Sequence, residues 1–278
     1  SVWWAFKSLY EKGLVYQGRR VILYCPRCST PLSNFEIAMD NSYAEIKDTS
    51  TIYKYPVKNQ ARTFLLAWST TPWNKLATPA LAINPNFTYV KVKQDGEWYI
   101  LAKNTLKILT SESYEIVESY SGRDLEKLEF TEHFRFFKAK TGEYHGVVVA
   151  DEYVTDADGT GVVTLAVYGE DDYRVMTKHK IQMIEHVDDE GKLKAAVKPW
   201  AGMFILKADP LIDGDLERRG LIYRHDSYTH RVPVCYRCNT RLYYTPIPAW
   251  FINIQKLKPE LIKANETINW YPGHLKHG

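Results

Sequence analysis

The residues of this 278-residue chain that are best suited to hold a metal ion are its four cysteines, which form two C-x-x-C pairs. The pairs are Cys25 with Cys28 and Cys235 with Cys238, near opposite ends of the sequence. Four thiolates match one closed tetrahedral zinc site, which has no open coordination position and is therefore structural. The pattern predicts one structural Zn²⁺ site that joins the ends of a long excursion of the chain. The alternative interpretation is four unrelated buried thiols.

A segment rich in hydroxyl and amide side chains, at 68–78, can form hydrogen bonds with a ligand. Pro72 forces a turn there, where a strand is predicted to end. Side chains on such a turn present donors and acceptors at fixed positions, although an ordinary Ser/Thr-rich turn has the same composition. The side chains concerned are Ser69, Thr70, Thr71, Asn74 and Thr78.

Three consecutive carboxylates, Glu170, Asp171 and Asp172, follow a glycine-flexed turn and an apolar run at 162–167. A carboxylate at the end of a strand can hold a substrate ammonium through charge-assisted hydrogen bonds. The same carboxylates can instead cap the next helix, because they bind its free amides and favour its positive end. From the residues alone, both interpretations stay open.

The elements that must position these segments are predicted to be mostly strands. Twenty Tyr and eight Trp, together with abundant Val, Thr and Ile, favour β-structure, and a hydrophobic content of 45% can form a sizeable core. The net charge of +3 is far from that of an autonomous nucleic-acid binder. Asp95-Gly96 predicts a hairpin turn. Strands are predicted at 21–24, 63–68, 89–93, 98–102, 147–149, 162–167 and 250–254, and helices at 2–10, 103–109, 209–219 and 255–268.

One inner segment reads Ser-Thr-Thr-Pro-Trp at 69–73, and another, at 159–173, contains Gly-Thr-Gly and Gly-Glu-Asp-Asp-Tyr. In their order and separation, these two segments resemble the editing domain of isoleucyl-tRNA synthetase. The resemblance covers nearly the whole chain and includes both cysteine pairs. Related valyl and leucyl enzymes carry Thr-Thr-Arg-Pro where this chain has Thr-Thr-Pro-Trp at 70–73, which favours the isoleucyl branch.

The resemblance implies an enzyme domain that hydrolyses valine wrongly esterified to isoleucine tRNA, by attack of water on the aminoacyl ester. Such a domain is needed because an isoleucine pocket rejects valine by only one methylene, about 1 to 3 kcal/mol. The implied roles are anchoring of the substrate ammonium by Asp172 and lining of the pocket by Thr70 and Thr71. Further implied substrate-binding residues are Ser69, Trp73, Asn74, Thr78, Thr164 and Asp171.

The resemblance also implies the partners of the chain. They are the acceptor end of isoleucine tRNA, the misattached valine and the catalytic domain of a parent synthetase. No catalytic metal is implied, and this chain is not expected to aminoacylate tRNA itself. We expect a piece of a longer protein that is soluble, monomeric and cytoplasmic, without membrane contact.

Several positions depart from the family pattern. Thr164 stands where the family usually has histidine, and Val167 stands where it has proline. Asn74 and Thr78 fall in a stretch where the usual Thr-Leu-Pro-x-Asn is replaced. Because these changes line one pocket, hydrolysis is expected to be weakened, retuned or lost.

Three functional hypotheses therefore stand beside one another. They are an editing hydrolase, an editing-deficient domain retained for tRNA docking or structure, and a zinc-ribbon nucleic-acid-binding module. The predicted fold is α+β and β-rich, an editing-domain β-barrel with short helices on a zinc-clipped base that the two chain ends form. Its predicted parts are a connecting segment at 1–50, an editing core at 51–205 and a second connecting segment at 206–278.

Overall fold

The chain folds into two compact units. The computed structural model describes residues 1–38 and 41–277. Unit 1 comprises residues 1–20 and 246–278, and unit 2 comprises residues 21–245. The division into 1–50, 51–205 and 206–278 stays a prediction. Within the described residues, no helix has the length and apolar character that a membrane crossing requires.

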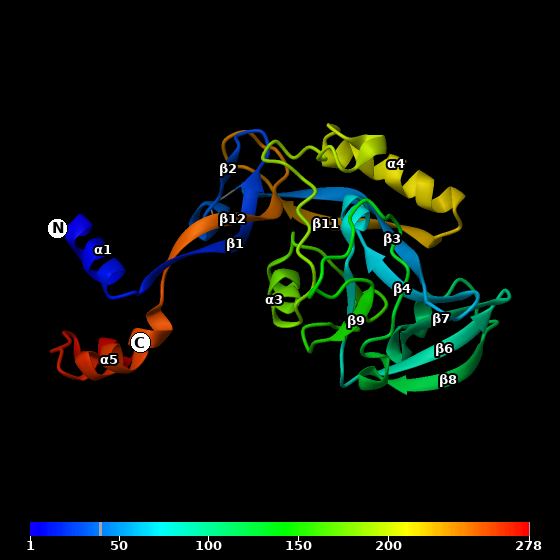
Figure 1. The fold of residues 1–278 in the computed structure, drawn as a ribbon, viewed down its shortest axis with the longest axis horizontal. Coiled ribbons are helices and arrows are strands. Elements are labelled where there is room, and N and C mark those ends of the chain that lie inside the picture. The colour runs from blue at the N-terminus through cyan, green and yellow to red at the C-terminus, as the bar shows by residue number, and fades with distance from the viewer. Residues whose placement is uncertain (39–40, 278) are drawn as a thin grey trace. The chain divides into compact units, whose positions relative to one another are not determined.

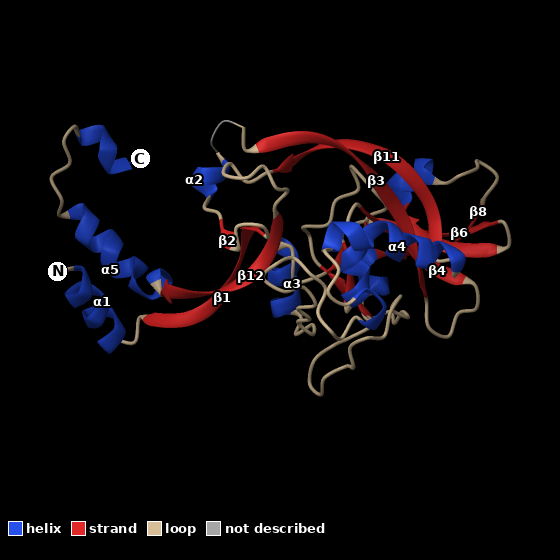
Figure 2. Ribbon diagram, turned by 90° about the horizontal axis from the view of Figure 1, so that it is seen from above, coloured by secondary structure: helices blue, strands red, loops and turns tan. Residues whose placement is uncertain are grey.

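A six-stranded sheet with the order β11-β3-β4-β7-β6-β8 is the largest sheet of unit 2 (Figure 1). Figure 2 shows β3 and β11 as long strands that curve side by side, and they pair antiparallel. The strands of this sheet are β3 (Tyr43–Pro56), β4 (Thr63–Ser69), β6 (Thr88–Gln94), β7 (Glu97–Ala102), β8 (Glu115–Ser121) and β11 (Ile222–Pro233).

This sheet is not closed into the expected β-barrel. Its edge strands are β11 and β8, which among the described residues pair with β3 and β6 but not with each other. A closed barrel requires the two edge strands to exchange backbone hydrogen bonds. Strand β8 is instead exposed along most of its length and carries Glu115 and Glu118, charges that protect a free edge. The α+β, β-rich class is confirmed, and the predicted barrel is not closed in this structure.

The main core of unit 2 joins this sheet to a three-stranded sheet with the order β10-β5-β9. Fully buried side chains come from both sheets and from two helices, for example Tyr53, Leu81, Val175 and Ile212. Because these elements share one close-packed core, the ends of their strands and helices are held in defined positions relative to one another. The bounds of the smaller sheet are β5 (Ala80–Ile83), β9 (Val147–Ala150) and β10 (Val162–Leu165).

The hairpin predicted at Asp95-Gly96 is confirmed, because both residues have positive φ, 52° and 75°, and β6 pairs antiparallel with β7. Positive φ at both central positions is what a type I′ turn requires.

The helix predicted to start at Asp209 begins earlier, as α4 (Ile205–Arg218), with Pro210 inside it. Burial of Ile205 and Ala208 in the core outweighs the one backbone bond that proline removes. The other helices are α1 (Val2–Glu11), α2 (Asn34–Ile37), α3 (Glu170–Lys178), α5 (Ile254–Glu266) and the 3₁₀ helices η1 (Pro72–Ala77), η2 (Lys103–Ile108), η3 (Gly122–Leu125), η4 (Lys198–Trp200) and η5 (Gly273–His277).

Unit 1 contains α1 and α5. Inside it, the rings of Tyr16 and Phe251 stack with centroids 5.4 Å apart, and the amide of Asn253 donates to the carbonyl of Leu14. A third sheet has the order β12-β1-β2, with β1 (Val15–Cys25), β2 (Thr30–Pro31) and β12 (Tyr243–Ile252).

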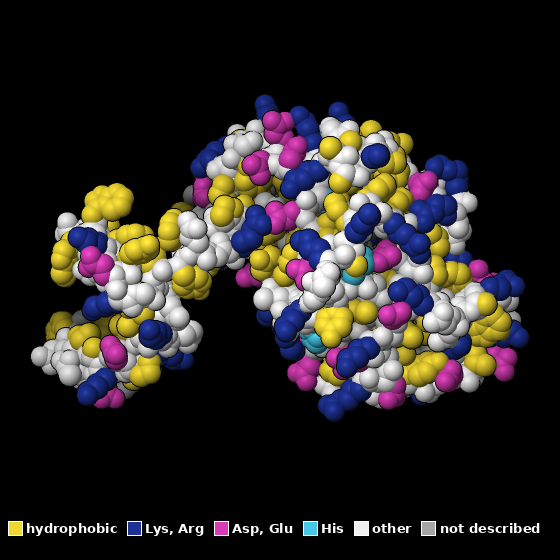
Figure 3. Space-filling view, viewed as in Figure 1, with side chains coloured by type: hydrophobic (Ala, Val, Ile, Leu, Met, Phe, Trp, Pro, Cys, Tyr) yellow, Lys and Arg dark blue, Asp and Glu magenta, His cyan; other side chains and the backbone are white. Residues whose placement is uncertain are grey.

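Charged side chains of both signs are interspersed on the visible face of unit 2 (Figure 3). With a net charge of only +3 for the whole chain, long-range attraction to a polyanion is mild. Recognition of a ligand therefore has to come from a shaped site.

Candidate functional site

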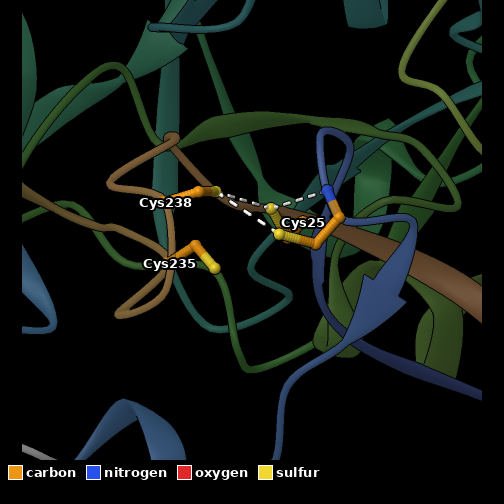
Figure 4. A group of neighbouring side chains, drawn as sticks. Cys25, Cys235 and Cys238 are labelled. Atoms are coloured by element: carbon orange, nitrogen blue, oxygen red, sulfur yellow. Dashed lines mark hydrogen bonds between the residues drawn. The ribbon is translucent and has the colours of Figure 1, made fainter.

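The four cysteine sulfurs come together, as their spacing predicts. All four Sγ atoms lie within 4.8 Å of one another. Cys235 and Cys238 face Cys25 across the cluster (Figure 4). The Sγ of Cys238 lies 3.5 Å from that of Cys25 and 3.6 Å from that of Cys28. A turn after β1 carries one pair, and the segment after β11 carries the other.

This cluster fits a tetrahedral metal site. Zn–S bonds of about 2.3 Å in a tetrahedron place the sulfurs about 3.8 Å apart, close to the separations observed. The amide of Cys28 donates to the Cys25 sulfur at 3.4 Å, and the Thr240 hydroxyl lies 3.2 Å from the Cys238 sulfur. Such contacts support thiolate ligands. The set of four sulfurs can hold a metal ion of the zinc type.

A cleft of about 330 Å³ in unit 2 is lined by both inner segments that the sequence singled out. They meet because β10 pairs antiparallel with β5, which directly follows η1 and its preceding turn. A cleft of this size can enclose a small ligand. The sequence-predicted residues that line it are Ser69, Thr70, Thr71, Asn74, Thr164 and Asp172.

The turn after β4 presents its hydroxyl groups to this cleft. The Ser69 Oγ accepts a hydrogen bond from the Thr71 amide at 3.1 Å, and it lies 3.1 Å from the Thr71 Oγ1. These bonds fix the turn that Pro72 begins to wind into η1. The Asn74 Oδ1 is buried without a hydrogen-bond partner among the described residues. A buried acceptor of this kind is normally satisfied by water or a ligand.

Gly159 and Gly161 also line the cleft, at positions where a side chain would not fit. Gly159 and Gly161 have φ of +76° and +72°, which side-chain-bearing residues rarely adopt. A Cβ on Gly161 would lie 2.4 Å from the Cβ of Ala102, and one on Gly159 would lie 3.1 Å from the Cβ of Trp68. The Gly-Thr-Gly segment therefore allows strand β7 and the cleft wall to approach closely.

Asp172 is half-buried in the first turn of α3 but does not cap that helix. Its Oδ2 accepts from the Ala166 amide at 3.3 Å, and its Oδ1 accepts from the Tyr153 hydroxyl at 3.1 Å. Burial raises the pKa of Asp172 to about 6, although these two donors and the charge of Lys75 oppose the rise. Above that pH the carboxylate is ionised and can bind a cation in the cleft. Nothing in the sequence pointed to Tyr153.

Three predicted substrate-binding residues lie outside the lining of this cleft. Asp171 is exposed and pairs with Arg174 at 3.3 Å. Trp73 is buried, and its amide donates to Asp209 at 2.8 Å. Thr78 is buried as well, and its hydroxyl donates to the carbonyl of Asn74 at 3.1 Å, so it supports the turn.

Lys75 is a polar residue of this site that the sequence reasoning missed. It projects from η1 into the core with 1% of its surface exposed. Its Nζ donates to the Thr164 Oγ1 at 2.8 Å and lies 5.1 Å from the centre of the Tyr53 ring. Burial lowers the pKa of Lys75 to about 7 against the opposing pull of nearby carboxylates, Asp172 first. In the sequence, the apolar neighbours Leu76 and Ala77 are the feature that could have indicated the burial of Lys75.

An acidic cavity of about 620 Å³ adjoins the same turn, since Thr70 and Pro72 also line it. Asp209 and Asp213 on α4 face this cavity. Burial raises the pKa of Asp209 to about 7. Asp213 is fully bonded within the protein, because it accepts from the hydroxyls of Thr51 and Tyr53. The charges of Asp213 and Asp209 favour the protonated form of Lys75 and so partly offset the cost of burying it.

Comparisons with known proteins agree on one group of relatives. The family model described as "tRNA synthetases class I (I, L, M and V)" matches residues 1–277. An isoleucine–tRNA ligase of Clostridium tetani is 40% identical over 279 aligned residues, which cover 100% of this chain and 26% of that protein. An isoleucine–tRNA ligase of Bacillus thuringiensis is 39% identical with the same coverage. The chain thus spans about a quarter of the length of these relatives.

Among solved structures, the chain is similar to the editing domain of the cytosolic leucyl-tRNA synthetase of P. knowlesi. That similarity has a TM-score of 0.49 and 12% sequence identity, and it covers 66% of this chain and 97% of the other.

Proposed function

The chain belongs to the class I tRNA synthetases of the isoleucine, leucine, methionine and valine group, and from this premise we propose that it is an isoleucyl editing domain. Its proposed reaction is hydrolysis of valine that has been esterified to isoleucine tRNA. The proposed partners are the acceptor end of that tRNA and the catalytic domain of a parent synthetase. The relatives that align over the whole chain support the isoleucyl assignment.

One observation carries this proposal: a half-buried carboxylate and a row of hydroxyl groups line the same small cleft. An aminoacyl ester carries an ammonium next to its reactive carbonyl. Asp172 suits the ammonium because its two oxygens are held in place by Tyr153 and Ala166. Thr70 and Thr71 suit the polar atoms of the ester, since hydroxyl groups donate and accept.

The proposed chemistry is hydrolysis by a positioned water. Water adds to the ester carbonyl carbon, and the bond from that carbon to the ribose oxygen breaks. One proton of the water passes to the ribose oxygen, and the other is released as the amino-acid carboxylate forms. No covalent intermediate with the protein is needed, so positioning and electrostatics have to lower the barrier.

The test is deacylation of valyl-tRNA for isoleucine by the 278-residue chain, with isoleucyl and threonyl esters in parallel. We expect valine to be released faster than in buffer, and Asp172→Asn to abolish the gain because the amide has no charge for the ammonium. After subtraction of spontaneous hydrolysis, the rate should rise as pH passes about 6, where Asp172 ionises. The control is Asp189→Asn, which changes an exposed aspartate outside the cleft lining.

Release of valine at the spontaneous rate would overturn the editing proposal and leave the two alternatives, an editing-deficient domain retained for tRNA docking or structure and a zinc-ribbon nucleic-acid-binding module. Equal rates for the wild type and Asp172→Asn, both above the buffer rate, would instead overturn the assignment of Asp172.

We also propose that the four cysteines hold one structural Zn²⁺. The separations of their sulfurs support this, and four protein ligands leave no position for water or substrate. Zinc would therefore join the first and last parts of unit 2 without entering the reaction. Metal analysis of the purified chain should give about one zinc per molecule, and a chain without metal would overturn the assignment.

A further inference from the structure

Lys75 is a buried charged residue next to the cleft, and the proposed reaction gives it no role. Its ammonium is buried, and its one hydrogen bond among the described residues goes to the Thr164 hydroxyl. An ammonium can only donate hydrogen bonds. Thr164 therefore accepts from Lys75, and the hydroxyl proton of Thr164 must point elsewhere.

The cleft is where that proton can find an acceptor. Thr164 lines the cleft, and its hydroxyl has no other hydrogen bond within the described part of the chain. A cation bonded to a hydroxyl oxygen also polarises the O–H bond, which makes the hydroxyl a stronger donor. With Lys75 as its donor partner, the Thr164 hydroxyl is left to act as a donor on the lining of the cleft.

Asp172 lines the same cleft and marks where a substrate ammonium would lie. In an aminoacyl ester, the α-carbon bears the ammonium and is bonded directly to the ester carbonyl carbon, so the ammonium and the carbonyl oxygen are close together. A donor that shares the cleft with Asp172 is therefore suited to meet that oxygen, which gains negative charge as water adds.

We propose that Thr164 donates its hydroxyl proton as a hydrogen bond to the ester carbonyl oxygen, and that Lys75 is the positioning residue that orients and polarises it. This inference rests on the proposed editing function. It assigns Thr164 a catalytic contact, and it gives the buried Lys75 a purpose that packing alone does not supply, because an apolar side chain would fill the same space without the cost of desolvation.

The test is a set of variants in the deacylation assay at pH 6.5, read as separate kcat and KM values with valyl-tRNA for isoleucine. Thr164→Val should lower kcat ~100-fold, the usual loss for one donor to a developing oxyanion. Lys75→Met should lower kcat ~10-fold, a polarised donor being stronger than a neutral one. KM should change little in either variant, because the bond strengthens in the transition state.

Two controls separate this role from a structural one. Thr164→Ser keeps the hydroxyl and should retain kcat to within about threefold, which packing of the methyl group would not predict. Lys107→Met should be neutral, since Lys107 occupies the last turn of another 3₁₀ helix but is exposed. The double variant Lys75→Met/Thr164→Val should be no slower than Thr164→Val, because Lys75 acts through Thr164.

The outcomes are distinct. An active wild type whose kcat survives Thr164→Val overturns this inference and leaves the editing proposal standing. A double variant slower than Thr164→Val by the full Lys75→Met factor also overturns it, because Lys75 would then act by another route. An inactive wild type overturns both proposals. Should Thr164→Val fail to fold, Lys75→Met decides, because its kcat should still fall ~10-fold and an unchanged kcat in that variant overturns the inference.

Discussion

Replacing Lys75 with methionine removes a buried charge while keeping a side chain of similar length. Lys75 is 1% exposed and lies within 4 Å of no carboxylate among the described residues. Its charge is stabilised instead by Thr164, by the face of Tyr53 and by carboxylates at longer range. The folded chain therefore holds this proton less tightly than the unfolded chain does.

The size of the effect follows from the pKa. Burial lowers the pKa of Lys75 from 10.5 to about 7, and each factor of ten in proton affinity is worth about 1.4 kcal/mol. Below pH 7 the lysine is charged in both states, and its burial costs the folded state about 5 kcal/mol. Between pH 7 and 10.5 the unfolded chain binds more protons, so the free energy of unfolding of the wild type rises with pH.

The assay is urea unfolding of the wild type and Lys75→Met at pH 6 and at pH 9.5, with equal metal content. We expect the variant to be the more stable protein at pH 6, by less than the full cost because the bond to Thr164 is lost. Its advantage should shrink by about 3 kcal/mol at pH 9.5, as the wild type sheds the buried charge. Lys107→Met is the matched control, and its stability relative to wild type should not depend on pH.

A difference between Lys75→Met and wild type that stays constant within about 0.5 kcal/mol over this range would refute the reasoning. It would mean that Lys75 keeps its proton as easily in the folded chain as in the unfolded one.

Three further substitutions test other parts of the site. Gly161→Ala should destabilise the chain by about 2 kcal/mol or more, because φ is +72° and the new Cβ would lie 2.4 Å from the Cβ of Ala102. Thermal unfolding measures this effect, and an unchanged melting temperature would contradict it. Cys25→Ser should abolish the proposed zinc binding and cost several kcal/mol of stability, and a chelator should destabilise the wild type in the same way. Metal analysis and urea unfolding test this, and a wild type that holds no metal and does not respond to the chelator would contradict it. Thr164→His alone should not raise the deacylation rate, because the Lys75 Nζ lies 2.8 Å from the hydroxyl that the imidazole would replace. The double variant Lys75→Leu/Thr164→His removes that conflict. A faster rate for the single variant would show that Lys75 does not constrain this position.

The sequence predicted the features that depend on local chemistry. Two C-x-x-C pairs predict a four-sulfur cluster because together they supply the four thiolates of a tetrahedral zinc site. Asp95-Gly96 predicts a hairpin because only small or turn-forming residues accept positive φ at both positions. Resemblance to a known family named nine residues for the substrate site, of which six line the cleft, whereas Trp73, Thr78 and Asp171 do not.

Tertiary structure decided what depends on partners distant in the chain. Helix α4 starts before Pro210 because Ile205 and Ala208 are buried in a shared core. The six-stranded sheet stays open because closure depends on whether β8 and β11 meet, which no strand encodes alone.

The clearest division concerns the carboxylates and Lys75. By residue type, Asp171 and Asp172 are equivalent neighbours in one acidic row. The fold places Asp172 in the cleft with a hydrogen bond from Tyr153, whereas Asp171 is exposed and pairs with Arg174. Lysine at position 75 would be taken for a surface residue, yet the pairing of β10 with β5 places Thr164 over it and water is excluded. Residue type thus determined which chemistry was available, whereas burial and neighbours, which exist only once distant segments pack, determined the charge states and the directions of the hydrogen bonds.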